Sequence, residues 1–234
     1  MMKTNATKQS LRKFVRQELK PLLIIALVMF AMRSALADWN DVPSGSMKPS
    51  ILVGDRVFVN KLAYDLKVPF TTWHLAQWDN PKRGDIVVFF SPADGKRLVK
   101  RVVGLPGDRI ELANNHLLVN GTPVEYNPLS QKTIAGLSPA EQPPHEYATE
   151  ELPGHPHPVM TTPAVPARRN FGPVLVPTSQ YFMMGDNRDD SFDSRYFGCV
   201  ERGEIVGRAT AVIFSLDHEA YYLPRWHRFG TSLP

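Results

Sequence analysis

Two serine hydroxyls in a short segment rich in glycine and proline are the first candidates for chemistry. Residues 42–51 read Val-Pro-Ser-Gly-Ser-Met-Lys-Pro-Ser-Ile, so Ser44 and Ser46 flank a glycine between two prolines. Glycine lets the backbone approach a ligand closely, and proline fixes φ and stiffens the loop. A serine nucleophile needs a general base, and this segment holds no acid or histidine. The base must come from elsewhere, or the segment is an ordinary turn.

A candidate base lies in the apolar run 97–103, where Lys100 and Arg101 are adjacent. Neighbouring residues of a strand face opposite sides, and the sequence does not say which of the two charges points inward. A guanidinium stays protonated in proteins, whereas a buried ammonium loses its proton readily. A free lysine, with a pKa of about 10.4, is neutral in only about 0.04% of molecules at pH 7. An apolar strand face would raise that fraction for Lys100; the alternative is a lysine that snorkels to solvent. Lys48 is nearer to Ser46 in sequence, but it lies in a polar loop.

The elements that must hold these residues are β-strands. Asp94-Gly95 and Asn120-Gly121 are strong hairpin signals, and Gly54-Asp55 marks a turn. Residues 63–80 follow no clear period. We therefore predict a mostly β chain with an antiparallel β-sheet catalytic domain. Its predicted strands span residues 56–61, 86–90, 97–103, 109–112, 116–119, 122–126, 180–184 and 205–214.

The segment 127–177 differs from its surroundings in composition. It holds eleven of the 21 prolines and few periodic apolar residues. Proline cannot donate to a β-ladder, and a segment with little apolar content builds little core. We predict a proline-rich surface insertion that is partly disordered, and we expect residues 129–173 of it to be dispensable for bond cleavage.

The N-terminus combines a basic arm with an apolar run. Residues 1–20 carry six basic residues against one acid, and the remaining chain is nearly neutral, with 21 basic and 22 acidic residues. This balance argues against a nucleic-acid-binding surface. The uninterrupted apolar run is short for a bilayer span, but the segment from Leu19 to Ala37 is long enough if Arg33 snorkels to the far interface, where Trp39 would also lie. We predict a basic cytoplasmic arm (1–20), a transmembrane anchor (21–37) and an extracytoplasmic β-rich domain (38–234).

Three alternatives to this anchor stay open. The run could be a cleaved signal peptide, because Ala35-Leu36-Ala37 resembles a cleavage site. It could also be a buried core helix or an interfacial helix. Retention as an uncleaved anchor is favoured, since removal would leave the Ser46 loop near a free end.

Four segments in this order resemble bacterial signal peptidase I, the membrane-anchored Ser-Lys leader peptidase family. Each segment alone is moderately specific, and their combination is highly specific. They are Pro43 to Pro49, Lys82 to Phe89, Lys100 to Asp108, and Gly185-Asp186-Asn187 through Asp193-Ser194-Arg195.

The resemblance implies that Ser46 is the nucleophile and Lys100 the general base. The Ser46 N–H and the Ser44 hydroxyl would form the oxyanion hole, placing two donors on the developing charge. Ser191 would hydrogen-bond the Lys100 amine and aim it at Ser46. Asp193 would pair with Arg195. Further residues would hold the loop or line the substrate pockets: Asp186 in the loop, and Val42, Met47, Ile51 and Val99 in the pockets.

The same resemblance implies an endopeptidase at the cytoplasmic membrane that removes signal peptides from exported preproteins without a cofactor or metal. The preproteins would carry small residues before the cut, and the lipid bilayer would be the second partner. Trp39-Asn40-Asp41 departs from the apolar character of this region in relatives. The alternatives are a self-cleaving repressor-type Ser-Lys peptidase and a catalytically silent membrane-anchored β module. A specialised conjugation-type peptidase is a near relative of the favoured reading.

Other chemistry is weakly indicated. His155-Pro156-His157 could supply half of a metal site, but no further ligand follows at a suitable spacing, so a structural role is favoured. Cys199 is the single cysteine, which excludes an intrachain disulfide.

Overall fold

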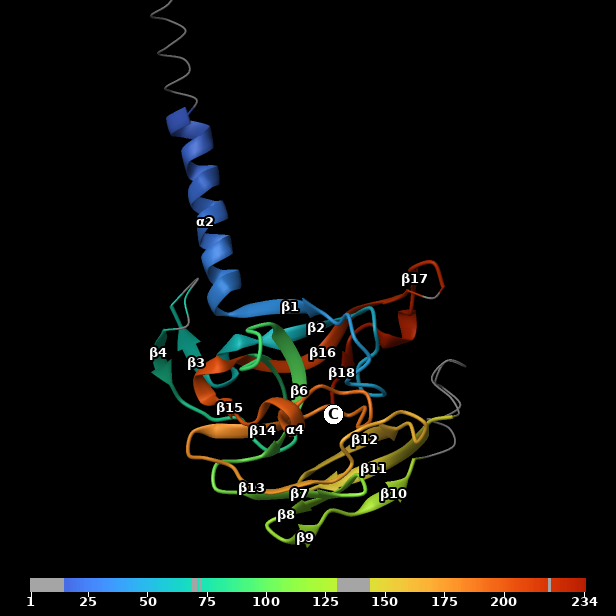
Figure 1. Cartoon of the computed structure of the whole chain (residues 1–234). Helices are drawn as coiled ribbons and strands as arrows, with labels where there is room; N and C mark the ends of the chain where they lie inside the picture. The colour runs from blue at the N-terminus through green and yellow to red at the C-terminus, as the bar shows by residue number, and fades with distance from the viewer. Residues whose placement is uncertain (1–14, 69–70, 72, 130–143, 219) are drawn as a thin grey trace, which may run out of the picture.

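The structure is a computed structural model that describes residues 15–68, 71, 73–129, 144–218 and 220–234 (Figure 1). The helical elements are η1 (Val15–Leu19), α2 (Lys20–Ala35), η2 (Lys61–Ala63), α4 (Ser194–Phe197), η4 (Arg202–Glu204) and η5 (Trp226–Arg228). The strands are β1 (Ala37–Asp41), β2 (Asp55–Asn60), β3 (Asp65–Lys67), β4 (His74–Gln77), β5 (Ile86–Phe90), β6 (Arg97–Gly104), β7 (Arg109–Ala113), β8 (His116–Val119), β9 (Thr122–Pro123), β10 (Tyr126–Pro128), β11 (Glu146–Leu152), β12 (His155–Thr161), β13 (Phe171–Leu175), β14 (Gln180–Met184), β15 (Val200–Glu201), β16 (Ile205–Asp217), β17 (Leu223–Pro224) and β18 (Thr231–Ser232).

The main sheet has the strand order β1-β2-β16-β5-β6-β14-β15, and β17 and β18 also pair with β16. Every strand pair in the described part of the chain is antiparallel, so the prediction of a mostly β, antiparallel fold is confirmed. The Asp94-Gly95 signal does close a hairpin, between β5 and β6, in which Val87 lies opposite Lys100. Residues 63–80, which the sequence left unassigned, contain the short hairpin β3–β4.

The main sheet is buried on both faces at its centre. In β2, buried residues alternate with exposed ones, whereas Ile86 to Phe89 of β5 are buried without interruption. Val42, Met47 and Ile51 of the serine-containing segment pack into one core cluster with residues of β2, β5 and β16. Burial of these side chains fixes the segment on the sheet, because each contributes about 1.5–3 kcal/mol of hydrophobic stabilisation.

The prediction that residues 127–177 form an insertion without ladders is wrong. β10, β11 and β12 form a three-stranded antiparallel sheet, and β13 pairs with β7 in a four-stranded sheet with β8 and β9. Leu152 and Val176 are 1% exposed and belong to a core cluster with residues of β7, β8 and β14. The predicted disorder at residues 130–143 lies outside the described residues. The segment is therefore a structural layer, which lies in Figure 1 at the end of the molecule away from α2.

The prolines fit this layer because of where they lie. Pro156 and Pro158 occupy alternate positions of β12, opposite Glu151 and Thr149 of β11. β12 is the edge strand of its sheet, so a proline whose missing N–H would point away from β11 removes no ladder hydrogen bond. Composition alone could not distinguish such an edge strand from a loop.

The N-terminal helix α2 projects from the β-body, and β1 begins at its base (Figure 1). The predicted membrane-spanning segment 21–37 is helical only to Ala35, since Ala37 already pairs with Asn60 of β2. No helix in the described ranges combines the length and hydropathy needed to cross a membrane. Residues 22–25 and 27–30 of α2 each have side chains at least half exposed.

Candidate active site

Ser46 and Lys100 meet between the segment that follows β1 and the middle of β6. Lys100 Nζ donates a hydrogen bond of 2.6 Å to Ser46 Oγ and one of 3.2 Å to the carbonyl oxygen of Val99. Ser46 is 9% exposed and Lys100 is 3% exposed. Ser44 Oγ lies 3.4 Å from Ser46 Oγ, at a distance where either hydroxyl can donate. The Ser46 hydroxyl thus lies within hydrogen-bond reach of both an amine and a second hydroxyl.

Burial lowers the pKa of Lys100 from 10.5 to about 8, against the opposing attraction of Asp193 and Asp186. Desolvation disfavours the charged ammonium, because the apolar surroundings cannot replace its hydration. With a pKa of about 8, about 9% of the amine is neutral at pH 7. This fraction is about 200 times that of a free lysine, and only the neutral amine can accept a proton. The Lys100 amine is therefore chemically able to accept a proton at neutral pH.

Arg101 is also buried, at 0% exposed, but on the opposite face of β6. Its guanidinium binds the Asp186 carboxylate in two hydrogen bonds, of 2.9 Å from Nε and 2.8 Å from Nη2. Asp186 also accepts a hydrogen bond from the Ser50 hydroxyl, at 2.5 Å. Burial raises the pKa of Asp186, but the Arg101 charge outweighs it and holds the pKa below its usual range. The sequence left undecided whether Lys100 or Arg101 points inward, and the structure shows that both side chains are buried. Lys100 contacts Ser46, and Arg101 binds Asp186 in the loop that follows β14.

Asn187 joins the loop that follows β14 to the serine-containing segment. Its backbone N–H donates to the Ser46 carbonyl oxygen at 3.1 Å, and its Nδ2 donates to the Gly45 carbonyl oxygen at 3.1 Å. A Cβ on Gly185 would lie 2.4 Å from the Ser46 carbonyl oxygen, so only glycine permits this approach. The sequence pattern included Asn187 in the Gly185-Asp186-Asn187 motif but predicted no role for it.

Ser191, Asp193 and Arg195 lie further along the same loop. The Asp193 carboxylate accepts two hydrogen bonds from the Arg195 guanidinium, at 2.8 Å each, and one from the Gly185 N–H at 3.1 Å. The hydrogen bond from Ser191 to Lys100 that the resemblance implies is not formed. Ser191 Oγ is buried without a hydrogen-bond partner among the described residues, and it lies where a Cβ on Gly185 would be 2.3 Å away. The Lys100 amine is directed instead by Ser46 and the Val99 carbonyl.

A pocket of about 330 Å³ opens beside the dyad. Its walls come from β1 and the following residues on one side and from β6 on the other, including Val42, Met47 and Val99 of the four predicted pocket residues. The fourth, Ile51, is fully buried in the core cluster rather than in the pocket wall. β1 pairs only with β2, and Leu98 to Lys100 pair only with β5, within the described part of the chain. Two unpaired strand edges therefore face the pocket.

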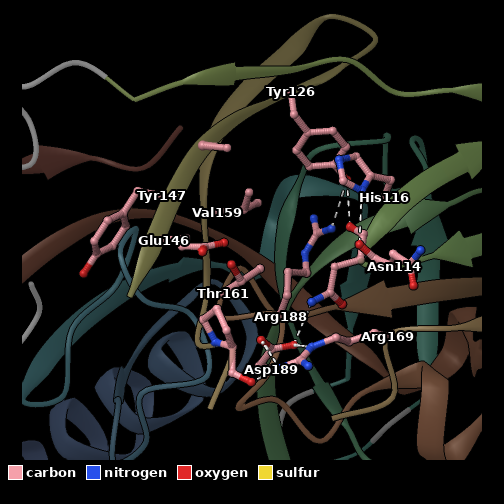
Figure 2. A pocket seen from close by; sticks show the side chains of 13 residues that line it. Asn114, His116, Tyr126, Glu146, Tyr147, Val159, Thr161, Arg169, Arg188 and Asp189 are labelled. Atoms are coloured by element: carbon pink, nitrogen blue, oxygen red, sulfur yellow. Dashed lines mark hydrogen bonds and ion pairs between the residues drawn. The ribbon is translucent and has the colours of Figure 1, made fainter. Parts of the chain in front are cut away.

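A second cavity, also of about 330 Å³, lies between the β7–β8 turn and the sheet β10-β11-β12 (Figure 2). In its wall Asp189 accepts hydrogen bonds from Asn115 at 2.7 Å and from Arg169 at 3.0 Å. Arg188 pairs with the buried Glu150 at 2.7 Å through each terminal nitrogen. The Arg188–Glu150 pair links β11 to the loop that carries Ser191, and Asp189 ties the same loop to Arg169, so the mispredicted segment braces the candidate active site.

The two histidines of His155-Pro156-His157 are not placed as a metal pair. His157 is 1% exposed, and its Nε2 lies 3.4 Å from Glu150 and 3.8 Å from Asp186. Burial lowers its pKa to about 4, so it is neutral at physiological pH. Within the described ranges, no three His, Cys, Asp or Glu side chains are grouped to hold a metal ion.

Residues 15–214 match the family model described as signal peptidase, peptidase S26. The chain is 36% identical over 223 residues to signal peptidase I of Pseudomonas fluorescens, covering 90% of this chain and 75% of that protein. It is likewise 36% identical over 226 residues to signal peptidase I of Pseudomonas aeruginosa, with the same coverage. Signal peptidase I P of Bacillus subtilis subsp. natto is 35% identical over 201 residues, covering 85% of this chain and 89% of that protein.

Proposed function

The chain belongs to the signal peptidase family, peptidase S26, and functions as a signal peptidase I, and on this premise we propose that it cuts by a Ser-Lys dyad. Ser46 is the nucleophile and Lys100 the general base. The observation that carries the proposal is the 2.6 Å hydrogen bond between Lys100 Nζ and Ser46 Oγ at a buried lysine whose pKa is lowered to about 8. Adjacent base and nucleophile are the general signature of an activated hydroxyl.

The reaction follows from the atoms present. Neutral Lys100 Nζ takes the Ser46 hydroxyl proton while Oγ attacks the scissile carbonyl carbon. Lys100 then gives that proton to the leaving amine as the C–N bond breaks, leaving an ester on Ser46. A water molecule attacks this ester with Lys100 again as base, which releases the signal peptide carboxylate and restores the serine.

The oxyanion would be bound by the Ser46 N–H and the Ser44 hydroxyl. In the described structure the Ser46 N–H donates to no protein acceptor, and Ser44 Oγ is 3.4 Å from Ser46 Oγ. Removal of one such donor typically lowers kcat about 100- to 1000-fold. Ser191, buried with an unused hydroxyl, would accept a hydrogen bond from the Lys100 ammonium after proton transfer.

The substrate would lie as an extended strand between the edges of β1 and β6. Both strands run toward the dyad, so a peptide whose scissile bond reaches Ser46 would run parallel to both. Backbone hydrogen bonds to strand edges give affinity, and alternate side chains enter pockets that give specificity. Met47, Val42 and Val99 line shallow space there, which suits small side chains at the first and third positions before the cut.

Membrane anchorage at the cytoplasmic membrane by residues 21–35 is part of this proposal. The apolar side chains of residues 22–25 and 27–30 are exposed on every side of this part of α2, as in a helix that contacts lipid. The six basic residues before Leu22 would keep the N-terminus in the cytoplasm and the β-domain outside. The pairing of Ala37 with Asn60 makes residues beside the cleavage-like Ala35-Leu36-Ala37 part of the sheet, which favours retention over removal.

The decisive test is cleavage of a preprotein with alanine at the first and third positions before the cut by purified full-length chain in detergent. Ser46→Ala should abolish cleavage, while Ser232→Ala, on the exposed strand β18, should retain it. Persistent cleavage by Ser46→Ala in a preparation free of host peptidase would contradict the assignment of the nucleophile.

A further inference from the structure

The groove between β1 and β6 changes character away from the dyad. Asp38 and Asn40 are half-buried and Trp39 is exposed, so Asp38 and Asn40 share the face of Val42, which lines the pocket. On the facing strand, Arg97 shares the face of Val99 two residues away. The apolar part of the groove beside Ser46 is thus followed by a polar part.

Arg97 spans this polar part. Its Nη1 donates to Asp38 Oδ2 at 3.3 Å and to Asn40 Oδ1 at 3.2 Å, while its guanidinium lies 5.5 Å from the centre of the Phe90 ring. The two hydrogen bonds are long, and the Arg97 side chain is 40% exposed. The guanidinium is therefore held in place across the groove but remains accessible to a substrate side chain.

The charge of this polar part is positive. Lys61 Nζ lies 3.4 Å from Asp38 Oδ2, and both side chains are largely buried. Burial raises the pKa of Asp38, but Lys61, the Trp39 N–H and Arg97 outweigh burial and hold the pKa below its usual range. One carboxylate thus faces two cations, so the cluster carries a net charge of about +1 at neutral pH.

We propose that Arg97, with Asn40 and Asp38, forms a further substrate subsite that binds a hydrogen-bond acceptor side chain at the fifth position before the cut. This inference rests on the proposed function, in which the substrate is a strand between β1 and β6. An extended strand presents every second side chain to one face, about 6.6 Å apart. If the first and third side chains enter the pocket at Met47 and Val42, the fifth faces Arg97.

The chemistry of the cluster selects the ligand class. An aspartate, glutamate, asparagine or glutamine oxygen can accept from the Arg97 guanidinium, whose N–H groups are all donors. A lysine or arginine at this position would meet the two positive charges of Lys61 and Arg97, which the single negative charge of Asp38 does not balance. A leucine would cover the guanidinium without replacing its hydrogen bonds to water, which is unfavourable.

The test compares preproteins that share alanine at the first and third positions and differ only at the fifth, where they carry Asp, Asn, Leu or Lys. For the full-length enzyme in detergent, kcat/KM for Asp should exceed that for Lys by about five- to tenfold, as for a charge-assisted hydrogen bond. The same substitutions at the fourth position, whose side chain faces away, should change kcat/KM by less than about twofold. Arg97→Glu should invert the ranking, so that Lys is preferred over Asp.

The matched control is Arg109→Gln, which removes an exposed arginine of β7, in a different sheet from the strands of the groove. It should keep the wild-type ranking. Equal turnover of all fifth-position variants, or an unchanged ranking in Arg97→Glu, would overturn the subsite. The proposed function would still stand in that case, because the enzyme would still cleave these substrates after alanine. Failure of the wild-type enzyme to cut any of these substrates would overturn both.

Discussion

Replacement of Lys100 tests the catalytic proposal most directly, because burial of this side chain has consequences for both activity and stability. Its pKa is lowered from 10.5 to about 8, so the ammonium form is about 3 kcal/mol less favourable in the native state than in the unfolded chain. The unfolded chain binds the proton more tightly, so this destabilisation is complete below about pH 8 and is relieved as the pH rises toward 10.5. Lys100→Met, with an apolar side chain of similar length, should remove it.

We therefore expect Lys100→Met to be inactive but more stable than the wild type at pH 7, by up to about 3 kcal/mol. The stability difference should shrink as the pH approaches 10.5. Urea denaturation of full-length protein in detergent at pH 7 and pH 10 measures this difference. A wild-type chain that is as stable as Lys100→Met at pH 7 would contradict the argument that the amine is buried at the expense of stability.

Activity should follow the neutral amine. kcat/KM should rise about tenfold from pH 6 to pH 7 and level off above about pH 9, since a base with a pKa of about 8 titrates in this range. Lys100→Arg keeps the positive charge but cannot act as a base, so it should be as inactive as Ser46→Ala. Lys96→Arg, on the exposed part of the same hairpin, is the matched control and should remain active. Wild-type-like cleavage by Lys100→Arg, or a flat profile from pH 6 to pH 9, would refute the dyad.

Three further outcomes are expected. Ser191→Ala should lower kcat/KM less than Lys100→Arg, because in the proposed mechanism Ser191 only accepts a hydrogen bond from the Lys100 ammonium after proton transfer; equal losses, measured on one preprotein, would give Ser191 a direct catalytic role. Glu150→Ala should destabilise the fold by about 3–5 kcal/mol by leaving Arg188 buried without its partner, and a thermal midpoint equal to that of the wild type would contradict this. A preprotein with phenylalanine immediately before the cut should be essentially uncleaved beside its alanine counterpart, since under the proposed substrate placement the pocket at Met47 takes only small side chains; similar kcat/KM values would contradict the pocket assignment.

Much of the strand order along the chain could be read from the sequence, because local chemistry decides it. Asn120 and Gly121 have φ of 55° and 81°, as the two-residue turn between β8 and β9 requires, and Asn-Gly is the dipeptide that tolerates both. The segment 127–177 shows where this reading failed. Its prolines suggested a loop, but Pro156 and Pro158 lie on an edge strand, and that position depends on which strands are neighbours.

The sequence by itself determined which residues could react: a serine in a stiff loop, and a lysine in an apolar run that could lose its proton. It could not determine that Lys100 and Arg101 are both buried, because each requires a partner from a distant segment: Ser46 for one and Asp186 for the other. It also could not show that Glu150 of the proline-rich segment pairs with Arg188 beside the Ser191 loop. Which charges can be buried is decided by tertiary pairing, since a charge leaves water only where the fold neutralises it or lowers its pKa.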